Sequence, residues 1–507
     1  MIFNSYEFIF IFFPLSLLGF YLISRFGSNY KIIYLSIVSL LFYTYWNSYS
    51  LLIILFSICI NYFLGSQLLK QEIKNYNLLL FSIIFNIIFL GYFKYLNFFI
   101  FNINFFLTLF NLTTISNFNI MLPLGVSFFT FTQITYLIEC YNKNIKVKNF
   151  FSYILFVTFF PHLIAGPILK YTSIINQFID KKIFIIDKTK IAVGITIFII
   201  GLGKKILIAD SIGYYADLIY NSSSNNVLEP QIILSWLGSI SYLFQLYFDF
   251  SGYSDMAIGI ALFFGILLPI NFNSPLRATS VIVFWNSWHI SLTQFIREYI
   301  YNPITIRLTR FSLEKSETQK IFLILIFPTL LTFTIIGFWH GANWTFVIFG
   351  LINGLFIVVN YLWNKIKLNN NRLSSLNTCI AWLITFLSIN ISFVLFRADN
   401  LLQALKIYKA MIGLNGMSYP SIESKFWEGS IIFNSGDFAN MLGLITISFF
   451  IVIFLPNTKT LIPFYKEKNF DNYKLFNSYW FPIILSLIFV ISLLQIKKTS
   501  PFLYFQF

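Results

Sequence analysis

Long apolar runs with almost no charge recur along this 507-residue chain. A helix that crosses a bilayer needs about 20 such residues, because each residue adds about 1.5 Å and the hydrocarbon layer is about 30 Å thick. Three further runs, at 97–112, 256–270 and 281–301, are ambiguous between spans and shorter segments. We predict spans near residues 8–24, 31–47, 50–65, 78–93, 121–138, 151–168, 190–209, 232–248, 321–338, 343–363, 379–396, 441–455 and 480–496.

The balance of residue types excludes an ordinary soluble protein. Hydrophobic residues make up 58% of the chain and charged residues only 10%, so a soluble fold would expose an apolar surface. The runs are continuous rather than alternating, which argues against a membrane β-barrel. We therefore predict an all-α polytopic membrane protein that is embedded in the lipid bilayer.

Charge placement predicts how the spans are oriented. The net charge is +15, but the basic residues form no dense run, so we expect no nucleic-acid partner and assign the charge to cytoplasmic loops. Arg25 and Lys31 follow the first run, which favours an outside N-terminus, and Lys70 and Lys143 then belong inside. Both loops can lie on the cytoplasmic side only if residues 97–112 do not cross the membrane fully. We predict that 97–112 is a re-entrant or interfacial helix.

The cysteines do not form a metal-binding pattern. Cys59, Cys140 and Cys379 are far apart and lie in or beside apolar runs, as small buried side chains do. No CxxC pair, HExxH motif or phosphate-binding glycine loop occurs. We expect no bound metal and no permanently bound cofactor.

His340 lies inside the apolar run TIIGFWHGANWTFVIFGLING. An ionisable side chain at membrane depth is costly and therefore indicates a functional site. The glycine pairs Gly337/Gly341 and Gly350/Gly354 have the small-xxx-small spacing that lets helices approach closely or leaves room for a ligand. On a helix, Trp344 would follow His340 on the same face. A tunnel-lining imidazole and an interhelical hydrogen bond are both compatible with this pattern.

His289 lies in FWNSWHISLTQFIREYIYNP, which reads as one amphipathic helix that Pro303 ends. A plain interfacial helix and the wall of a site remain alternatives. Polar residues Ser287, Ser291, Gln294 and Glu298 share one side. The apolar side carries the histidine together with Trp285, Trp288, Leu292, Ile296 and Tyr299.

Two other motifs place polar groups among apolar residues. His162 lies between Pro161 and Gly166, where we expect a broken helix and a structural role. Asp249 and Asp255 occur in YFDFSGYSD. For them we favour a broken helix whose backbone donors the carboxylates satisfy, with a cation or proton path as the alternative.

Taken as a set, the motifs resemble the membrane-bound O-acyltransferase (MBOAT) family, in particular its alginate and peptidoglycan O-acetyltransferase membrane subunits. They occur in order from about residue 121 to the C-terminus. The matching stretches are LPLGVSFFTFTQITYLIECY, FVTFFPHLIAGPILKY, FQLYFDFSGYSDMAIG, NFNSPLRATSVIVFWNSWHISLTQFIREYIYNP, GFWHGANWTFVIFGLINGL, FVLFRAD and SPFLYFQF.

The resemblance implies a ring-like bundle of about 11–13 transmembrane helices, with re-entrant or interfacial helices and a central tunnel. It implies one transmembrane domain over 1–507. Within that domain, 1–120 would be peripheral N-terminal helices, 121–400 the catalytic core, and 401–507 the C-terminal helices with the terminal FLYFQF tail.

The resemblance also implies the chemistry. His340 falls on the family's hallmark histidine and His289 on its second position. We expect His340 to act as general base, since imidazole titrates near working pH, and His289 to orient the acceptor or polarise the thioester, although these roles can be exchanged. The remaining expected site-wall residues are Trp285, Trp288, Trp339, Asn343 and Trp344.

The implied donor is cytosolic acetyl-CoA, and the implied location is a bacterial inner membrane, crossed many times. The acetyl group would pass outward to an SGNH-type transferase or esterase that modifies an alginate-, cellulose- or peptidoglycan-type polysaccharide. In related systems a C-terminal tyrosine is thought to carry the acyl group, so Tyr504 is a candidate relay, with a packed aromatic tail as the alternative.

Two rival functions follow from the same features. Within the family, D-alanyl transfer to teichoic acid uses a separate membrane peptide, whereas here the tail is fused to the chain. A transporter or flippase for lipid-linked sugars would also explain many spans and few charges, but its paired repeats are not visible in the sequence.

Overall fold

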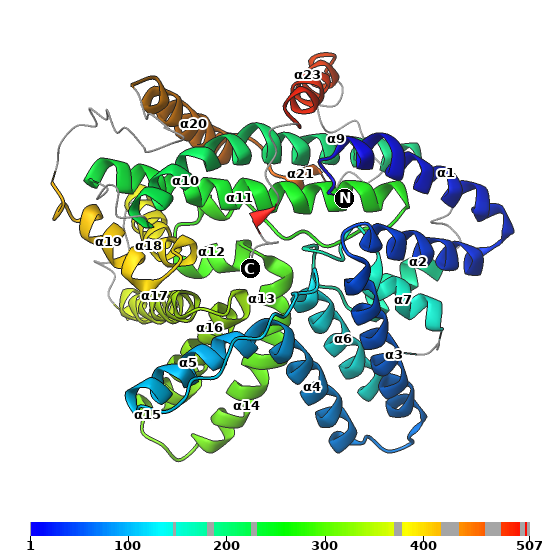
Figure 1. Ribbon diagram of the computed structural model, residues 1–507, viewed down its shortest axis with the longest axis horizontal. Helices are drawn as coiled ribbons and strands as arrows, with labels where there is room; N and C mark the ends of the chain where they lie inside the picture. The colour runs from blue at the N-terminus through cyan, green and yellow to red at the C-terminus, as the bar shows by residue number, and fades with distance from the viewer. Residues whose placement is uncertain are drawn as a thin grey trace.

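The computed structural model describes residues 2–145, 149–179, 187–224, 231–369, 378–416, 435–461, 478–496 and 502–503. Within these ranges it is helical, with no strand. In Figure 1, α9, α10 and α11 run across the upper half of the molecule, and α3, α4, α6 and α14 fan out below them.

Short π-helical turns adjoin or interrupt several of the longer helices in the first half of the chain; the label η marks these turns and also the 3₁₀ turns. A π-turn holds one extra residue and changes which side chains face a neighbouring helix. The elements are η1 (Phe8–Phe12), α1 (Phe13–Ile23), the 3₁₀ turn η2 (Ser24–Phe26), α2 (Ser28–Thr44), α3 (Ser48–Lys70), α4 (Tyr76–Leu90), η3 (Gly91–Tyr95), α5 (Leu96–Leu109), α6 (Val126–Tyr141), α7 (Phe150–Thr158), α8 (Tyr171–Ile179), α9 (Lys188–Gly203), η5 (Lys204–Ala209), α10 (Asp210–Ser224) and α11 (Ile232–Phe263).

The second half of the chain follows the same pattern. Its elements are the 3₁₀ turn η6 (Pro275–Arg277), α12 (Val281–Ser287), α13 (Ile290–Ile296), η7 (Arg297–Tyr301), α14 (Asn302–Phe311), α15 (Glu317–Ile321), η8 (Phe322–Ile326), α16 (Phe327–His340), α17 (Trp344–Asn369), α18 (Thr378–Arg397), α19 (Leu401–Met411), α20 (Ser435–Phe454), α21 (Thr458–Leu461) and α23 (Trp480–Gln495).

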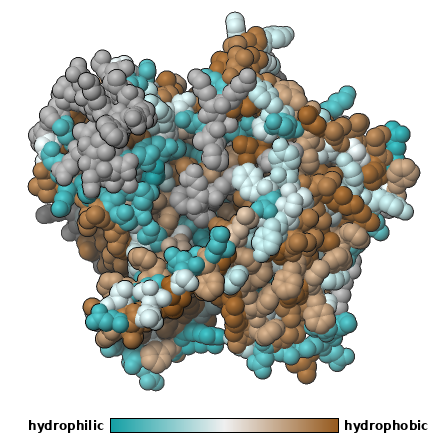
Figure 2. All heavy atoms as spheres, viewed as in Figure 1, coloured by the Kyte–Doolittle hydropathy of each residue, from teal (hydrophilic) through white to brown (hydrophobic). Residues whose placement is uncertain are grey.

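Eight helical stretches within the described ranges are long and apolar enough to cross a membrane. This number is below the predicted eleven to thirteen, because predicted spans such as α2, with 17 residues, and α6 and α23, with 16 each, are shorter. Large apolar side chains remain exposed on the outer helices, and Figure 2 shows them spread over the α1–α4 side. Such a surface suits contact with lipid.

The predicted separate helix over 97–112 is wrong in its boundaries. The structure joins α4, η3 and α5 into one 34-residue candidate span, Tyr76–Leu109. Where the sequence suggested a break between two helices, the chain forms the π-turn Gly91–Tyr95, which has one extra residue and lets the helix continue. A re-entrant or interfacial position for its second half stays a prediction.

Helix α11 forms the centre of the bundle. Every residue from Tyr242 to Leu262 is buried, and the helix packs against α9, η5 and α10. The break that we predicted in it around Asp249 and Asp255 is wrong, because α11 is continuous from Ile232 to Phe263.

The two carboxylates of α11 form ion pairs instead of capping a broken helix. Asp255 lies 2.7 Å from the Lys204 ammonium, and Asp249 lies 2.6 Å from the Lys205 ammonium, which also contacts Asp210 at 2.8 Å. Both lysines come from η5. A buried charge is tolerated when it is paired in this way.

The C-terminal segment reaches this ion-paired cluster. The backbone N–H of Leu503 donates to Asp249 Oδ2 at 3.0 Å. The buried ring of Phe502 lies 4.8 Å from the Lys205 ammonium and packs edge-on against Tyr253, with centroids 4.6 Å apart. Tyr504, the predicted relay, lies outside the described residues.

Candidate active site

Helices α16 and α17 approach each other closely at their glycines. A Cβ atom added to Gly337 would lie 2.9 Å from the Cα of Gly350, and one added to Gly350 would lie 3.1 Å from the Cα of Gly337. The first distance is shorter than real Cβ contacts and the second is at their tight end, and each added atom would lie closer still to a backbone oxygen, that of Phe346 for Gly337 and that of Phe333 for Gly350. Of the two uses that the glycine spacing allowed, close approach of helices is the one that Gly337 and Gly350 serve, and it places the end of α16 against the start of α17.

His340 is the last residue of α16, because Gly341 is extended, with φ −159° and ψ 151°. The imidazole is surrounded by aromatic rings. Trp339 lies 4.9 Å away on one side, and Phe396 of α18 lies 5.1 Å away, both edge-on. His340 is only 5% exposed.

His340 contributes to two cavities. One, which we call the Lys94 cavity, has a volume of about 130 Å³ and is lined by residues that include Lys94, Ser127, Trp339 and His340. The other, which we call the His289 cavity, has a volume of about 280 Å³. Its lining is mostly apolar and includes Trp285, Trp288, His289, Arg297, Ile336 and His340.

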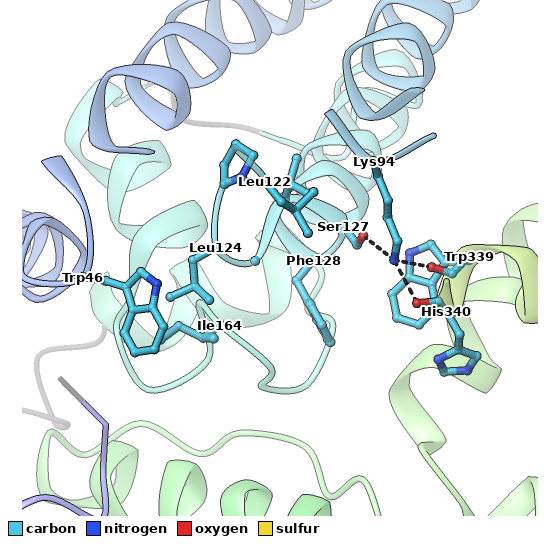
Figure 3. Close-up of a pocket in the computed structure, with 12 residues that line it drawn as sticks. Trp46, Lys94, Leu122, Leu124, Ser127, Phe128, Ile164, Trp339 and His340 are labelled. Atoms are coloured by element: carbon cyan, nitrogen blue, oxygen red, sulfur yellow. Dashed lines mark hydrogen bonds between the residues drawn. The ribbon is translucent and has the colours of Figure 1, made fainter. Parts of the chain in front are cut away.

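The Lys94 ammonium binds the end of α16 (Figure 3). It donates to the carbonyl oxygens of Trp339 at 2.7 Å and His340 at 3.0 Å, and more weakly to Ser127 Oγ at 3.4 Å. The neighbouring Tyr95 hydroxyl lies 3.0 Å from the carbonyl oxygen of Phe338. A cation at this position is favourable because the C-terminal end of a helix is electronegative.

His289 lies between two helices rather than within one. Helix α12 ends at Ser287, Trp288 is extended, and His289 adopts the left-handed conformation with φ 44° before α13 begins at Ile290. The predicted continuous amphipathic helix is therefore wrong. Pro303 is also not a terminator, because α13, η7 and α14 follow one another without a gap from Ile290 to Phe311, and the π-turn η7 comes directly before the helix that holds the proline.

The break brings the His289 ring toward the end of α16. The ring contacts Phe250 of α11 edge-on at 4.8 Å and lies 6.4 Å from the Trp339 ring. Since Trp339 also contacts His340, one indole packs against both histidines. A left-handed non-glycine residue costs about 1–3 kcal/mol and tends to occur at functional sites.

The predicted site-wall residues separate into two groups. Trp285 and Trp288 line the His289 cavity, and Trp339 lines the Lys94 cavity. Trp344 lines neither; it is 47% exposed, and its indole N–H donates to Asn102 Oδ1 at 2.9 Å. Asn343 also lines neither: its side chain donates to the carbonyl of Asp399 and accepts from the N–H of Thr345.

The predicted position of Trp344 beside His340 is wrong, because the prediction assumed one continuous helix through His340. The extended Gly341 ends α16, so the residues that follow begin a new helix with its own direction. Asn343 consequently caps the start of α17 instead of facing a substrate.

Comparison with known proteins agrees with this architecture. Residues 38–396 match the family model described as MBOAT, membrane-bound O-acyltransferase family. The chain belongs to the membrane-bound O-acyltransferase family. It is therefore an acyltransferase embedded in a membrane through multiple spans, as the resemblance implied.

Relatives of this acyltransferase extend over most of its length. It is 39% identical to a peptidoglycan O-acetyltransferase of Helicobacter pylori, over 82% of this chain and 81% of the relative. It is 35% identical to a probable alginate O-acetylase of Pseudomonas aeruginosa, over 81% and 75%. A teichoic acid D-alanyltransferase of Lacticaseibacillus rhamnosus is 29% identical over 48% of this chain and 60% of its own.

Lys94 lies at the candidate site of this acyltransferase, but the sequence did not identify it as a site residue. It is the only charged residue in the 34-residue span Tyr76–Leu109. A lone cation in such a span is costly unless it has a partner or a function. That observation marks the residue, but only the folded chain shows that its partners are the carbonyls beside His340.

Proposed function

We propose that this acyltransferase takes acetyl from cytosolic acetyl-CoA and passes it across a bacterial cell membrane for O-acetylation of an extracytoplasmic polysaccharide. One observation carries the proposal: His340 contributes to both the Lys94 cavity and the His289 cavity. A residue that borders two cavities can meet a donor from one and an acceptor from the other.

Charge distribution supports a cytosolic mouth for the His289 cavity. The chain after His289, from 297 to 320, contains five basic residues, Arg297, Arg307, Arg310, Lys315 and Lys320. The segment 110–125, which enters the lining of the Lys94 cavity, contains no charged residue. Basic residues accumulate in cytoplasmic loops, so we assign donor entry to the His289 cavity.

The character of the His289 cavity suits an acyl-thioester arm. Its walls are mostly aromatic and aliphatic, and Arg297 lies in its lining. An apolar channel accommodates the extended arm of acetyl-CoA, while a guanidinium is well suited to contact the phosphates of the nucleotide end. Acetyl-CoA is then a substrate that leaves as CoA, not a bound cofactor.

The proposed reaction uses the two histidines. The His340 imidazole removes the proton from the acceptor hydroxyl as its oxygen attacks the thioester carbonyl. The His289 ring orients the acceptor or donates to the developing oxyanion. The tetrahedral intermediate expels the CoA thiolate, which takes the proton back from the imidazolium, so the cycle ends with neutral histidine and free CoA.

The acceptor within the membrane is proposed to be the Tyr504 hydroxyl, which would then hand acetyl to an SGNH-type transferase outside. Support comes from the preceding residues. Phe502 and Leu503 are buried against the Asp249–Lys205 ion pair, so the chain is held up to the residue before the tyrosine. Mass spectrometry of the C-terminal peptide during turnover tests the relay, and an unmodified Tyr504 in trapped enzyme removes it.

The polymer is proposed to be peptidoglycan or alginate, and peptidoglycan should be assayed first. The peptidoglycan O-acetyltransferase of Helicobacter pylori shares 39% identity with this chain and the alginate O-acetylase 35%. D-alanyl transfer has less support, because the D-alanyltransferase matches only 48% of the chain.

The decisive experiment measures transfer from radiolabelled acetyl-CoA with protein in lipid vesicles. Wild type should release CoA and label the polymer in the presence of the extracytoplasmic transferase, and His340→Ala should lose both activities. His162→Gln is the matched control, because the His162 ring is bonded to the Phe156 carbonyl at 3.0 Å and lines neither cavity. Wild-type rates in folded His340→Ala would refute the assignment.

A further inference from the structure

We propose that Lys94 is a positioning residue for acyl transfer: its ammonium holds the carbonyl groups of Trp339 and His340 and thereby sets the place of His340 between the two cavities. The kinetic part of this inference rests on the proposed function. The structural part concerns only where the His340 ring is held.

The end of a helix leaves its last carbonyl groups without partners inside the helix. In α16 these groups belong to residues up to His340, because Gly341 is extended. Lys94 and Tyr95 supply the missing donors: Lys94 contacts the carbonyls of Trp339 and His340, and Tyr95 those of Phe338 and, at 3.3 Å, Trp339. The backbone that carries the imidazole is therefore fixed from another helix.

The local shape of the chain explains how two successive residues reach the same target. Neighbouring side chains on a regular α-helix point about 100° apart. Lys94 and Tyr95 occupy the last two positions of the π-turn Gly91–Tyr95, where the wider turn changes their directions. Both then face the end of α16. π-turns of this kind occur frequently at functional sites.

The contacts of the Lys94 ammonium differ from those of a lysine in an ordinary ion pair. Within the described ranges, no carboxylate lies within 4.0 Å of its ammonium, so the carbonyl oxygens and Ser127 Oγ are its polar contacts there. The rings of Trp339 and Tyr95 lie 5.8 and 5.9 Å away. Figure 3 shows the imidazole of His340 on the far side of its backbone from the ammonium.

A second lysine performs the same task at a helix end that lines neither cavity. Lys143 donates to the carbonyls of Leu68 at 2.7 Å and Leu69 at 3.2 Å and also to that of Gln71, at the end of α3. This lysine shows what helix capping alone provides. It is the matched control for Lys94, because both are half-buried and both bind consecutive carbonyls.

The consequence of losing Lys94 follows from the geometry. Without the ammonium, the carbonyls of Trp339 and His340 lose their donor, and the last turn of α16 is free to shift. A displacement of about 1 Å in a reacting group can lower a rate by about 100-fold. We expect Lys94→Met to reduce kcat by about 10- to 100-fold, with the KM for acetyl-CoA unchanged, because the ammonium is assigned no contact with the donor.

The experiment compares Lys94→Met, Lys94→Arg and Lys143→Met in lipid vesicles, with folding checked by thermal melting. Lys94→Arg keeps the cation and should recover most of the wild-type kcat. Lys143→Met should lower the melting temperature but leave kcat unchanged. Wild-type kcat in Lys94→Met, or an equal loss of kcat in Lys143→Met, would overturn the proposal, as would failure of both Lys94 variants to fold.

Chemical modification gives a readout that needs no turnover. The chain has three histidines, so the rates at which diethyl pyrocarbonate modifies each can be followed by mass spectrometry, with His162 as internal reference. Lys94→Met should change the rate at His340 severalfold and Lys143→Met should not. Inactive wild type would defeat the proposed function alone, whereas an unchanged rate at His340 would defeat the Lys94 proposal.

Restoration of the ammonium completes the test. Alkylation of Lys94→Cys with 2-bromoethylamine rebuilds a lysine-like side chain and should raise kcat toward wild type. Lys94→Ser, treated identically, controls for modification of Cys59 and Cys379, which are exposed. A positioning role for the ammonium is ruled out if the alkylated Lys94→Cys protein is folded but is no more active than its untreated form.

Discussion

The indole of Trp339 packs edge-on against the imidazole of His340, with ring centroids 4.9 Å apart, at the residue where α16 ends. The same indole lies 6.4 Å from the His289 ring, which belongs to a different helix pair. The two histidines that the sequence singles out therefore share one aromatic neighbour. Their surroundings and the two cavities lead to four predictions.

The backbone at His289 predicts a difference between two substitutions. Asparagine tolerates the left-handed conformation, whereas a β-branched residue does not. Both His289→Asn and His289→Val should lose acetyl transfer, because neither keeps the imidazole. We expect His289→Val to be less stable than His289→Asn by about 1–3 kcal/mol, measured by thermal melting in detergent. Equal melting temperatures would show that the φ of 44° is not a constraint.

Arg297 tests the assignment of the donor entrance. If the phosphates of acetyl-CoA bind near the mouth of the His289 cavity, Arg297→Gln should raise the KM for acetyl-CoA about tenfold, which corresponds to about 1.4 kcal/mol, and leave kcat unchanged. Arg310→Gln is the control, because Arg310 is not in the lining of that cavity. The opposite pattern, a changed kcat with an unchanged KM, would contradict donor binding there.

Close packing of α16 on α17 predicts that Gly350 does not accept a side chain. Its added Cβ would meet the backbone of Phe333 and Gly337, which cannot move aside without shifting the helix. Gly350→Ala should destabilise the protein by about 1–3 kcal/mol and lower activity, since α16 carries His340. Gly443→Ala on α20 is the matched control, because no atom lies within 4 Å of its added Cβ. A similar melting temperature for both variants would contradict the packing.

The ion pair between Asp249 and Lys205 predicts a large loss of stability when one partner is removed. The two side chains are 2% and 1% exposed, and Asp249 also accepts from the Leu503 N–H. Asp249→Asn should cost about 3–5 kcal/mol and increase proteolysis of the C-terminal segment. Lys170→Gln removes an exposed pair with Glu298, 46% exposed on both sides, and should cost less than about 1 kcal/mol.

A small effect of Asp249→Asn would mean that the C-terminal segment is held by other contacts. Two measurements separate the possible causes. The melting temperature reports the ion pair, and limited proteolysis reports the position of Phe502 and Leu503. If proteolysis is unchanged while the melting temperature falls, the cluster stabilises the helices without holding the tail.

Periodicity and composition predicted much of the fold correctly because both are local properties. Continuous apolar runs identify membrane helices wherever they pack. The glycine spacing around His340 indicated either a close helix contact or space for a ligand, and α16 and α17 make the close contact. The errors arose where the local pattern continued but the backbone did not, as at Trp288 and His289, or where a predicted break was absorbed, as within Tyr76–Leu109.

The sequence by itself determined that this chain is a helical membrane acyltransferase with an imidazole at position 340 inside an apolar run, since hydrophobic length and motif order need no knowledge of contacts. Only the tertiary structure decided which groups surround that imidazole. Lys94 reaches the carbonyls of residues 339 and 340 across 245 and 246 positions of the chain. A contact at that separation depends on how two helices pack, and no pattern along either helix specifies it.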